Sequence, residues 1–303
     1  MDLKLVHTAV DAYAKDASRS DAARLRFFEG LFDIQQQRAD LVAASDGYEV
    51  PAAPEAFELY RDNAPVFSKA PVTLDAAEFQ KTCELLAAYL ASEAGLADEA
   101  AQALAAYDWA QFVGHADLGL AGSDPALFIE RMLQGISELD VSDDLPANVF
   151  MMVPAFALRA HLQPAAELIA KAARKGKPED EPGHVHPVDC PICGTPSTAS
   201  WVGAGAGSDG RGREQYCSMC GHQWEYERVR CGACGSTNQN KLHYKNLEGD
   251  SAHRLLTCDD CGGYQRVVFR EELDPSCPMV MEMEDVVMAK LDQVALDPRF
   301  RNQ

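Results

Sequence analysis

Eight of the ten cysteines occur as four pairs with two residues between the partners, and a glycine directly follows each pair. Two thiolates at this spacing can bind one ion only where the chain turns tightly between them. Glycine takes the positive φ that lets the following backbone N–H groups point at the sulfurs and offset part of their charge. Where thiols stay reduced, such pairs indicate metal ligation rather than disulfides. The pairs are Cys190 and Cys193, Cys217 and Cys220, Cys231 and Cys234, and Cys258 and Cys261.

The spacing between the pairs also repeats. Cys190 and Cys217 are 27 positions apart, as are Cys231 and Cys258, and the two units are offset by 41 positions. The repeat predicts two tandem modules, each closing one tetrahedral four-thiolate site. In the competing arrangement the second and third pairs would share an ion across a ten-residue gap, which leaves the outer pairs far apart. The favoured sites are Cys190, Cys193, Cys217 and Cys220, and Cys231, Cys234, Cys258 and Cys261.

The spacing leaves the metal open, because tetrahedral thiolate sites suit both zinc and a mononuclear iron of the rubredoxin kind. Either ion would hold together modules of about 40 residues, which have too little core to fold unaided. Iron could also cycle one electron. The histidines His184, His186 and His222 flank the pairs. Since each site already has four thiols, we expect these histidines to support the sites or to lie at the surface.

The charge of the chain argues against a nucleic-acid partner. Its 303 residues carry 27 basic and 47 acidic side chains, a formal charge of −20. Residues 1–182 hold 15 basic and 30 acidic side chains, and residues 183–303 hold 12 and 17, so neither part has the basic surface that neutralises phosphates. A nucleic-acid-binding ribbon remains an alternative, because arginines and a tryptophan lie within residues 211–230.

No run of about 18 apolar residues and no secretory signal occurs in the sequence. We therefore expect a cytoplasmic protein without membrane insertion. No set of residues stands out as a catalytic constellation, so an enzyme is not expected. The tandem modules have strand edges that could pair between chains, which makes a homodimer possible.

The first 175 residues are rich in alanine, leucine and glutamate and predict a stack of antiparallel helices. Four prolines predict a break over residues 51–71. Pro154 and Pro164 lie inside the last predicted helix, which would then be two helices or one kinked helix. Cys83 lies on an apolar stripe and is expected to be a core thiol. The predicted helices cover residues 20–44, 73–95, 98–114, 124–138 and 144–172.

A polar, proline-rich segment at residues 175–187 marks the predicted domain boundary. The glycine-rich residues 203–212 lack the ending of a phosphate loop and are expected to form the tip of a hairpin. A helical pattern returns at residues 278–296, where the methionines are expected to pack in a core, and the isolated thiol of Cys277 is expected to be structural. The predicted strands lie within residues 212–217, 222–230, 242–246, 252–258 and 264–270.

The predicted fold class is α+β, with an all-helical N-terminal domain, two rubredoxin-like or zinc-ribbon four-cysteine modules and a C-terminal helix. The predicted domains are the acidic helical domain at residues 1–182, the first module at residues 183–226, and the second module with the C-terminal helix at residues 227–303.

The motifs HVHPVDCPICGTP, YCSMCGHQW, VRCGACGS and LLTCDDCGGY follow an acidic helical half. In this order they resemble the formate dehydrogenase accessory protein family, FdhE. The resemblance implies a cytoplasmic maturation factor that binds the catalytic subunit of respiratory formate dehydrogenase before export. It also implies two rubredoxin-like sites, each holding one iron on the cysteines named above. An electron-transfer protein of the rubredoxin type remains an alternative.

Overall fold

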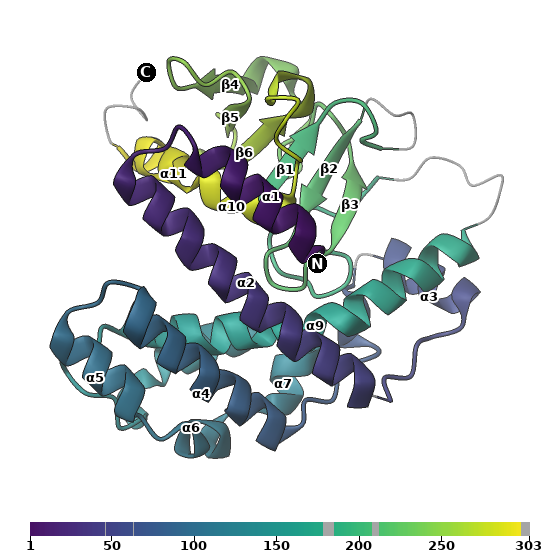
Figure 1. Ribbon diagram of the computed structural model, residues 1–303. Coiled ribbons are helices and arrows are strands. Elements are labelled where there is room, and N and C mark those ends of the chain that lie inside the picture. The colour runs from purple at the N-terminus through teal and green to yellow at the C-terminus, as the bar shows by residue number, and fades with distance from the viewer. Residues whose placement is uncertain (46, 63, 178–184, 208–211, 298–303) are drawn as a thin grey trace. The chain divides into compact units, whose positions relative to one another are not determined.

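The structure, a computed structural model, describes residues 1–45, 47–62, 64–177, 185–207 and 212–297 (Figure 1). The chain divides into two compact units. We call them the helical unit and the ribbon unit. The predicted domain boundaries stay a prediction. The helical unit comprises Met1, Gly30–Glu179 and Pro191–Thr195, and the ribbon unit comprises Asp2–Glu29, Asp180–Cys190 and Pro196–Gln303.

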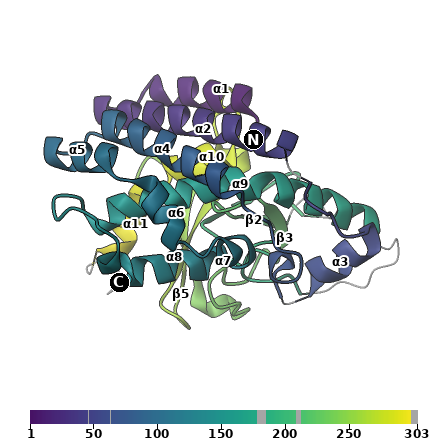
Figure 2. The same ribbon diagram turned by 90° about the horizontal axis from the view of Figure 1, so that it is seen from below.

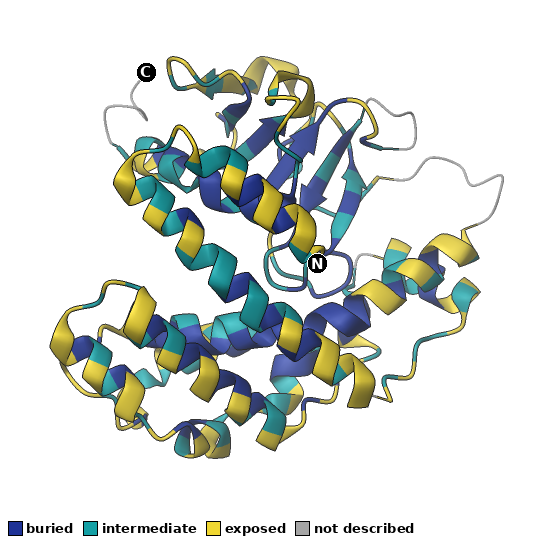
Figure 3. Ribbon diagram, in the orientation of Figure 1, coloured by how far each residue is buried: buried dark blue, intermediate teal, exposed yellow. Residues whose placement is uncertain are grey.

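The core of the helical unit lies between α4 and α9, where Phe79, Leu86, Leu158 and Leu162 are fully buried. Cys83 is also fully buried on α4, which confirms the prediction of a core thiol, and burial raises the pKa of this thiol. Figure 3 shows buried residues along most of α9. The elements of this unit are the C-terminal part of α2 (Arg19–Ser45), α3 (Ala53–Arg61), η1 (Val66–Ser68), α4 (Ala76–Glu93), α5 (Asp98–Ala106), α6 (Trp109–His115), α7 (Leu118–Ser123), α8 (Pro125–Gln134), η2 (Ile136–Glu138) and α9 (Ala147–Gly176).

Side-chain caps set several of these helix ends. The Asp75 carboxylate accepts a hydrogen bond from the N–H of Glu78 at 2.9 Å and starts α4. The predicted helix over residues 98–114 is interrupted, because Asp108 has extended backbone and its carboxylate accepts from the N–H groups that begin α6. The apolar period continues across this break, so periodicity alone predicted one helix where there are two.

The prolines of α9 do not divide it. Pro154 and Pro164 both lie inside one continuous helix of 30 residues, and both are buried. Each proline removes one backbone N–H from the helix. The burial of the flanking residues on several sides shows that packing around α9 offsets this loss.

The stretch of residues 51–71 was wrongly predicted as a continuous break, because it contains α3. Pro54 lies in the first turn of α3, where a missing N–H costs no hydrogen bond. The helix packs along the end of α9, as Figure 2 shows. At Gly176 an added Cβ would lie only 1.9 Å from the carbonyl oxygen of Ala53, so this approach requires glycine.

The ribbon unit contains one six-stranded sheet with the order β3-β2-β1-β6-β5-β4. Each module supplies three consecutive antiparallel strands, and the parallel pairing of β1 with β6 joins the modules, with Trp201 opposite Val268. All five predicted strands are confirmed, whereas β1 was missed. The strands are β1 (Ala199–Val202), β2 (Arg213–Tyr216), β3 (Gln223–Tyr226), β4 (Leu242–Asn246), β5 (His253–Cys258) and β6 (Tyr264–Phe269).

Three helices complete the ribbon unit together with the first part of α2. The predicted C-terminal helix consists of two short ones, α10 (Met281–Val287) and α11 (Ala289–Leu296). Met281 of α10 and Met288, which lies between the two helices, pack with Trp201 in one core cluster, as expected for packing methionines. Helix α1 (Leu3–Ala14) was not predicted. Short 3-10 turns occur at η3 (Gln239–Lys241) and η4 (Arg270–Glu272).

The predicted hairpin tip at residues 203–212 connects β1 to β2, and its residues 208–211 lie outside the described residues. Among the helices that the structure describes, none combines the length and apolarity needed to cross a bilayer.

Candidate metal centres

The eight paired cysteines form two clusters in the arrangement that the sequence repeat favoured. Within each cluster the four Sγ atoms lie within 4.8 Å of one another, and all ten cysteines are free of disulfides. The competing arrangement, with the middle two pairs sharing an ion, does not occur. The first cluster is Cys190, Cys193, Cys217 and Cys220, and the second cluster is Cys231, Cys234, Cys258 and Cys261.

The sulfur spacing fits a tetrahedral ion. Four sulfurs about 2.3 Å from a central ion lie about 3.8 Å from one another. In the first cluster the Sγ atoms of Cys190 and Cys220 are 3.6 Å apart. In the second, Cys231 and Cys261 are 3.8 Å apart, and Cys234 and Cys258 are 3.9 Å apart. Both clusters therefore have the donor set and dimensions for one zinc or one iron.

The glycine after each pair has the conformation that the motif requires. Gly194, Gly221, Gly235 and Gly262 have φ values of 77°, 80°, 75° and 68°. In the last three, the glycine N–H donates to the carbonyl oxygen of the first cysteine of the pair, at 2.8, 3.0 and 2.8 Å. This tight turn brings the two sulfurs of each pair to one side of the chain.

Backbone N–H groups also point at the sulfurs of the second cluster. The N–H groups of Ala233 and Cys234 donate to Cys231 Sγ at 3.4 and 3.5 Å, and that of Gly263 donates to Cys261 Sγ at 3.4 Å. Burial raises the pKa of Cys231, but the N–H groups of Cys234 and Ala233, together with the thiols of Cys234 and Cys258, outweigh burial and bring the pKa below its ordinary value. The turn of the third pair thus favours the thiolate of Cys231, the form that binds metal, whereas burial and the neighbouring thiols raise the pKa of Cys258 and Cys261.

The first cluster is enclosed, since all four of its cysteines are buried. Within the helical unit, Val66 and Phe67 of η1 donate their N–H groups to the carbonyl oxygens of Pro191 and Ile192, both at 2.9 Å. Ile192 is fully buried between Cys190 and Cys193 in the sequence. A Cβ on Gly194 would lie 2.7 Å from Pro65, so the turn is tightly covered.

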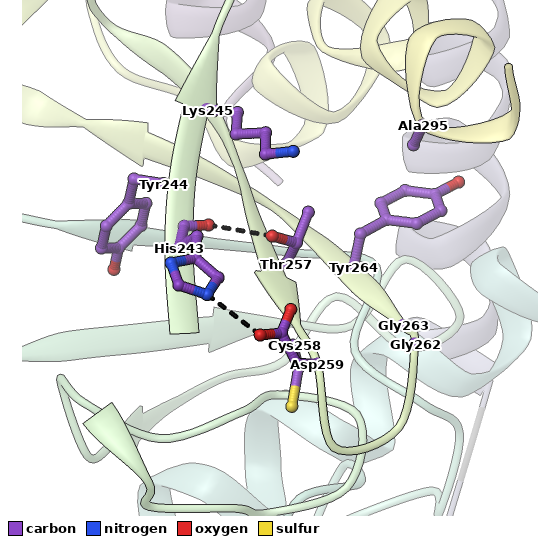
Figure 4. A pocket seen from close by; sticks show the side chains of 10 residues that line it. All are labelled: His243, Tyr244, Lys245, Thr257, Cys258, Asp259, Gly262, Gly263, Tyr264 and Ala295. Atoms are coloured by element: carbon purple, nitrogen blue, oxygen red, sulfur yellow. Dashed lines mark hydrogen bonds and ion pairs between the residues drawn. The ribbon is translucent and has the colours of Figure 1, made fainter. Parts of the chain in front are cut away.

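The second cluster is open on one side. Cys231 and Cys258 are buried, whereas Cys234 and Cys261 are exposed. A Cβ on Gly262 would meet no atom within 4 Å, in contrast to Gly194. Next to this cluster lies a cavity of about 670 Å³ lined by residues of β4, β5, β6 and the turn between β5 and β6, including Cys258 (Figure 4). The sequence repeat contained no signal of this difference in exposure.

The flanking histidines take no part in either cluster of the described chain. His186 bonds Glu227 through its N–H at 3.0 Å and through Nδ1 at 3.1 Å. The ring of His222 stacks on Trp224. His184 lies outside the described residues. Neither His186 nor His222 belongs to a four-cysteine group, and His222 is buried rather than at the surface.

Arg213 of the first module and Arg230, which follows β3, serve internal contacts. Arg213 is fully buried, where it donates to Ser200 Oγ and to the carbonyl oxygen of Arg230. Arg230 donates to Glu227 and to the carbonyl oxygen of His186. These guanidinium groups hold the module together and do not form a surface for phosphates.

One buried polar network was not found from the sequence. Glu284 of α10 is fully buried and accepts from Tyr13 Oη, while its Oε2 lies 2.9 Å from His253 Nε2. His253 Nδ1 in turn lies 2.9 Å from Asp250, which pairs with Lys290 at 3.0 Å. The only feature of the sequence that indicated this network was Glu284, an acidic residue within an apolar helical stripe.

The isolated thiol Cys277 lies apart from both clusters and is half-buried. Burial and the charge of Glu284 raise its pKa to about 11. At neutral pH this thiol is therefore protonated and a weak nucleophile.

The fold and the clusters define the class: an α+β protein in which two tandem modules share one sheet and hold two four-cysteine clusters. Residues 189–228, which contain the first cluster, match a protein-family model described as FdhE, central domain. The family model therefore matches the part of the chain that contains the first cluster.

Curated relatives extend this match. Protein FdhE of Escherichia coli O9:H4 (strain HS) is 34% identical over 115 residues, which are 38% of this chain and 33% of the relative. A protein FdhE homolog of Rhizobium meliloti (strain 1021) is 31% identical over 178 residues, 57% of this chain and 53% of the relative. The chain thus matches about a third to a half of the length of these relatives.

The crystal structure of the FdhE protein from Pseudomonas aeruginosa has the same fold, with a TM-score of 0.53 and 21% sequence identity over 97% of this chain and 92% of that one. The family model, the relatives and the shared fold together confirm the resemblance to the FdhE family that the cysteine motifs indicated.

Proposed function

We propose that this protein is a cytoplasmic accessory protein for the maturation of respiratory formate dehydrogenase. It binds the catalytic subunit before export and has no catalytic activity of its own. The observation that supports this most directly is the pair of four-thiol clusters, one of them in the segment that matches the FdhE central domain. The partner and the timing of binding come from the family resemblance.

Each cluster would bind one ion through its four cysteines. The sulfur spacing and the all-thiolate donor set fit both iron and zinc, and we propose iron in both clusters, with zinc as the alternative. A bound iron would supply a one-electron couple, whereas zinc would be purely structural. The chain supplies the turns that converge the sulfurs and the backbone N–H groups that offset their charge.

The test is an affinity purification of the tagged full chain from its own host, grown anaerobically with nitrate and formate. We expect mass spectrometry to identify a formate dehydrogenase catalytic subunit. The variant with Cys190→Ser and Cys193→Ser should lose this partner and should also abolish formate dehydrogenase activity in cells without lowering synthesis of the subunit. The matched control is Cys277→Ser, which removes a thiol outside both clusters.

Failure of the wild-type chain to recover such a subunit would refute the proposed partner. Normal formate dehydrogenase activity with the first-cluster variant would refute a requirement for that cluster.

Electron transfer is a second candidate, favoured by the exposure of two cysteines of the second cluster. An exposed ligand brings the ion within reach of a redox partner. Metal analysis and visible spectra after anaerobic purification test it. Colourless protein with two zinc ions per chain, obtained from iron-replete cells, would exclude this function.

A further inference from the structure

The sheet of the ribbon unit ends at β4, which pairs with β5 on one side only. Such an edge strand presents backbone N–H and C=O groups that can pair with another chain. Cys258 donates its N–H to Gly263, toward β6, and Asp259 donates to Lys241, toward β4. Because these directions alternate along a strand, His243 and Lys245 bond β5, while Tyr244 and Asn246 point their backbone groups outward.

The outward backbone of Tyr244 is available for pairing. Among the described residues, no backbone or side-chain group hydrogen-bonds its N–H or C=O, and the residue is 42% exposed. The residues of β4 are exposed or half-buried along its whole length. In the part of the chain that the structure describes, no strand covers this edge, and β4 contains no proline that would block pairing.

The side chains of β4 divide by charge. Within β4, His243 and Lys245 alternate with Leu242 and Tyr244 and share one face. Lys241 is the last residue of η3, and its carbonyl oxygen accepts from the N–H of Asp259, so it continues the pairing with β5 directly before β4. Figure 4 shows the side chain of Lys245 on one side of β4 and the ring of Tyr244 on the other. In a chain with a net charge of −20, this is a local basic stripe along a free strand edge. His243 also lies 3.2 Å from Asp259, which partly neutralises the stripe.

The basic face borders the cavity of about 670 Å³ beside the second cluster. Its lining includes Lys245, Thr257, Tyr264 and Ala295, which lie on the same side of β4 in Figure 4. A strand paired with β4 would place alternate side chains beside His243 and Lys245 and the others beside Tyr244, which also lines the cavity. Backbone bonds would give affinity and the two faces would give specificity.

The opposite edge of the sheet is β3, whose charge differs from that of β4. Cys217 donates its N–H to the carbonyl oxygen of His222, so by alternation Gln223 and Glu225 of β3 point their backbone outward. Their side chains are neutral and acidic, and Glu225 lies 3.9 Å from His186. Outward-pointing backbone alternates along β3 as it does along β4, but β3 contains no basic residue, which makes β3 the control edge.

We propose that β4 is a docking edge for an extended segment of a partner protein that carries carboxylates on alternate positions. The segment adds a seventh strand to the sheet, with its carboxylates facing Lys241, His243 and Lys245. The identity of the partner as the formate dehydrogenase catalytic subunit rests on the proposed function. The chemistry of the segment rests on the strand and its charges alone.

The test uses the metal-loaded full chain and a short synthetic peptide in which glutamate alternates with valine. We expect the peptide to slow hydrogen exchange of the amides of Tyr244 and Asn246, and binding should weaken with added salt. A peptide with lysine in place of glutamate should bind at least about tenfold more weakly, because it meets like charges. No slowing at these amides, or equal binding of the lysine peptide, would overturn the proposal.

Two variants make the test specific. Tyr244→Pro removes the outward N–H and keeps the inward bonds of its neighbours, so it should weaken peptide binding at least about tenfold. Glu225→Pro makes the same change at the β3 edge and should leave binding unchanged. Equal binding by wild type and Tyr244→Pro, or equal loss in both variants, would refute docking at β4. Should Tyr244→Pro fail to fold, Lys245→Glu replaces it and should reverse the preference between the peptides.

The same variants are then tested for capture of the catalytic subunit from the host. Loss of capture in Tyr244→Pro alone supports this edge as the site for that partner. Peptide binding at β4 without capture by the wild-type chain would refute the proposed function and leave the docking edge standing.

Discussion

Replacing Glu284 by glutamine tests the buried network that joins α1, β5 and α10 within the ribbon unit. The Glu284 side chain is fully buried and lies within 2.9 Å of both Tyr13 Oη and His253 Nε2. Glutamine keeps the size of the side chain but removes the charge. His253 then remains buried beside Asp250 with one of its two carboxylate partners lost.

The magnitude follows from the burial of the pair. Removing one partner of a buried ion pair costs about 3–5 kcal/mol, because the other charge is left uncompensated. Burial alone lowers the pKa of His253, but Asp250 and Glu284 outweigh burial and raise it from 6.5 to about 9. The difference corresponds to about 3 kcal/mol of stability from protonated His253. We expect Glu284→Gln to lower the free energy of unfolding by about 3 kcal/mol at pH 6.5.

The pH dependence of the free energy of unfolding tests the same ion pair independently. The folded pKa of His253 lies above its unfolded value, so the folded state holds the extra proton between pH 6.5 and 9. The stabilisation is fully present below pH 6.5 and is lost as the pH rises through about 9. In Glu284→Gln this loss with rising pH should be smaller, since less stabilisation is present at the start.

The assay is urea unfolding of the metal-loaded chain at several pH values with metal content held constant. The control is Glu272→Gln, which breaks an exposed ion pair with Arg254 and should cost no more than about 1 kcal/mol. Equal costs for the two variants, or an unchanged pH slope in Glu284→Gln, would refute the buried ion pair.

Three further outcomes are expected. In the metal-loaded chain, alkylating reagents should label the exposed Cys234 and Cys261 before any cysteine of the enclosed first cluster. Peptide mass spectrometry can show the order of labelling, and earlier labelling of the first cluster would contradict its enclosure. Gly194→Ala should destabilise the first cluster more than Gly262→Ala destabilises the second, as a chelator titration can measure. Both glycines have a positive φ, which costs alanine about 1–2 kcal/mol, but only a Cβ at residue 194 would also meet Pro65. Removal of the metal by a chelator should abolish the strand signal in circular dichroism and leave most of the helical signal, because the small modules depend on their ions to fold. An unchanged strand signal would show that the modules fold without metal.

The spacing of the cysteines along the chain was sufficient to predict the two clusters. The equal separations of 27 positions predicted which pairs converge, and the glycine after each pair predicted the turn, because both depend on residues close in the chain. Five of the strands and the principal helices followed from alternation and helical period for the same reason. The exceptions were local as well: all four residues of β1 are buried, so the strand lacks an alternating pattern, and Pro54 lies in the first turn of α3 rather than preventing the helix.

The sequence by itself thus determined two four-thiol centres, a helical half and an α+β class, since each depends on short-range patterns. Only the tertiary structure decided that the modules share one sheet through β1 and β6, and that Tyr13 of α1 reaches Glu284 of α10. The same holds for the enclosure of the first cluster and the exposure of the second. The repeat makes the two clusters equivalent in sequence, whereas their burial depends on which distant residues pack against them, and spacing along the chain carries no record of those contacts.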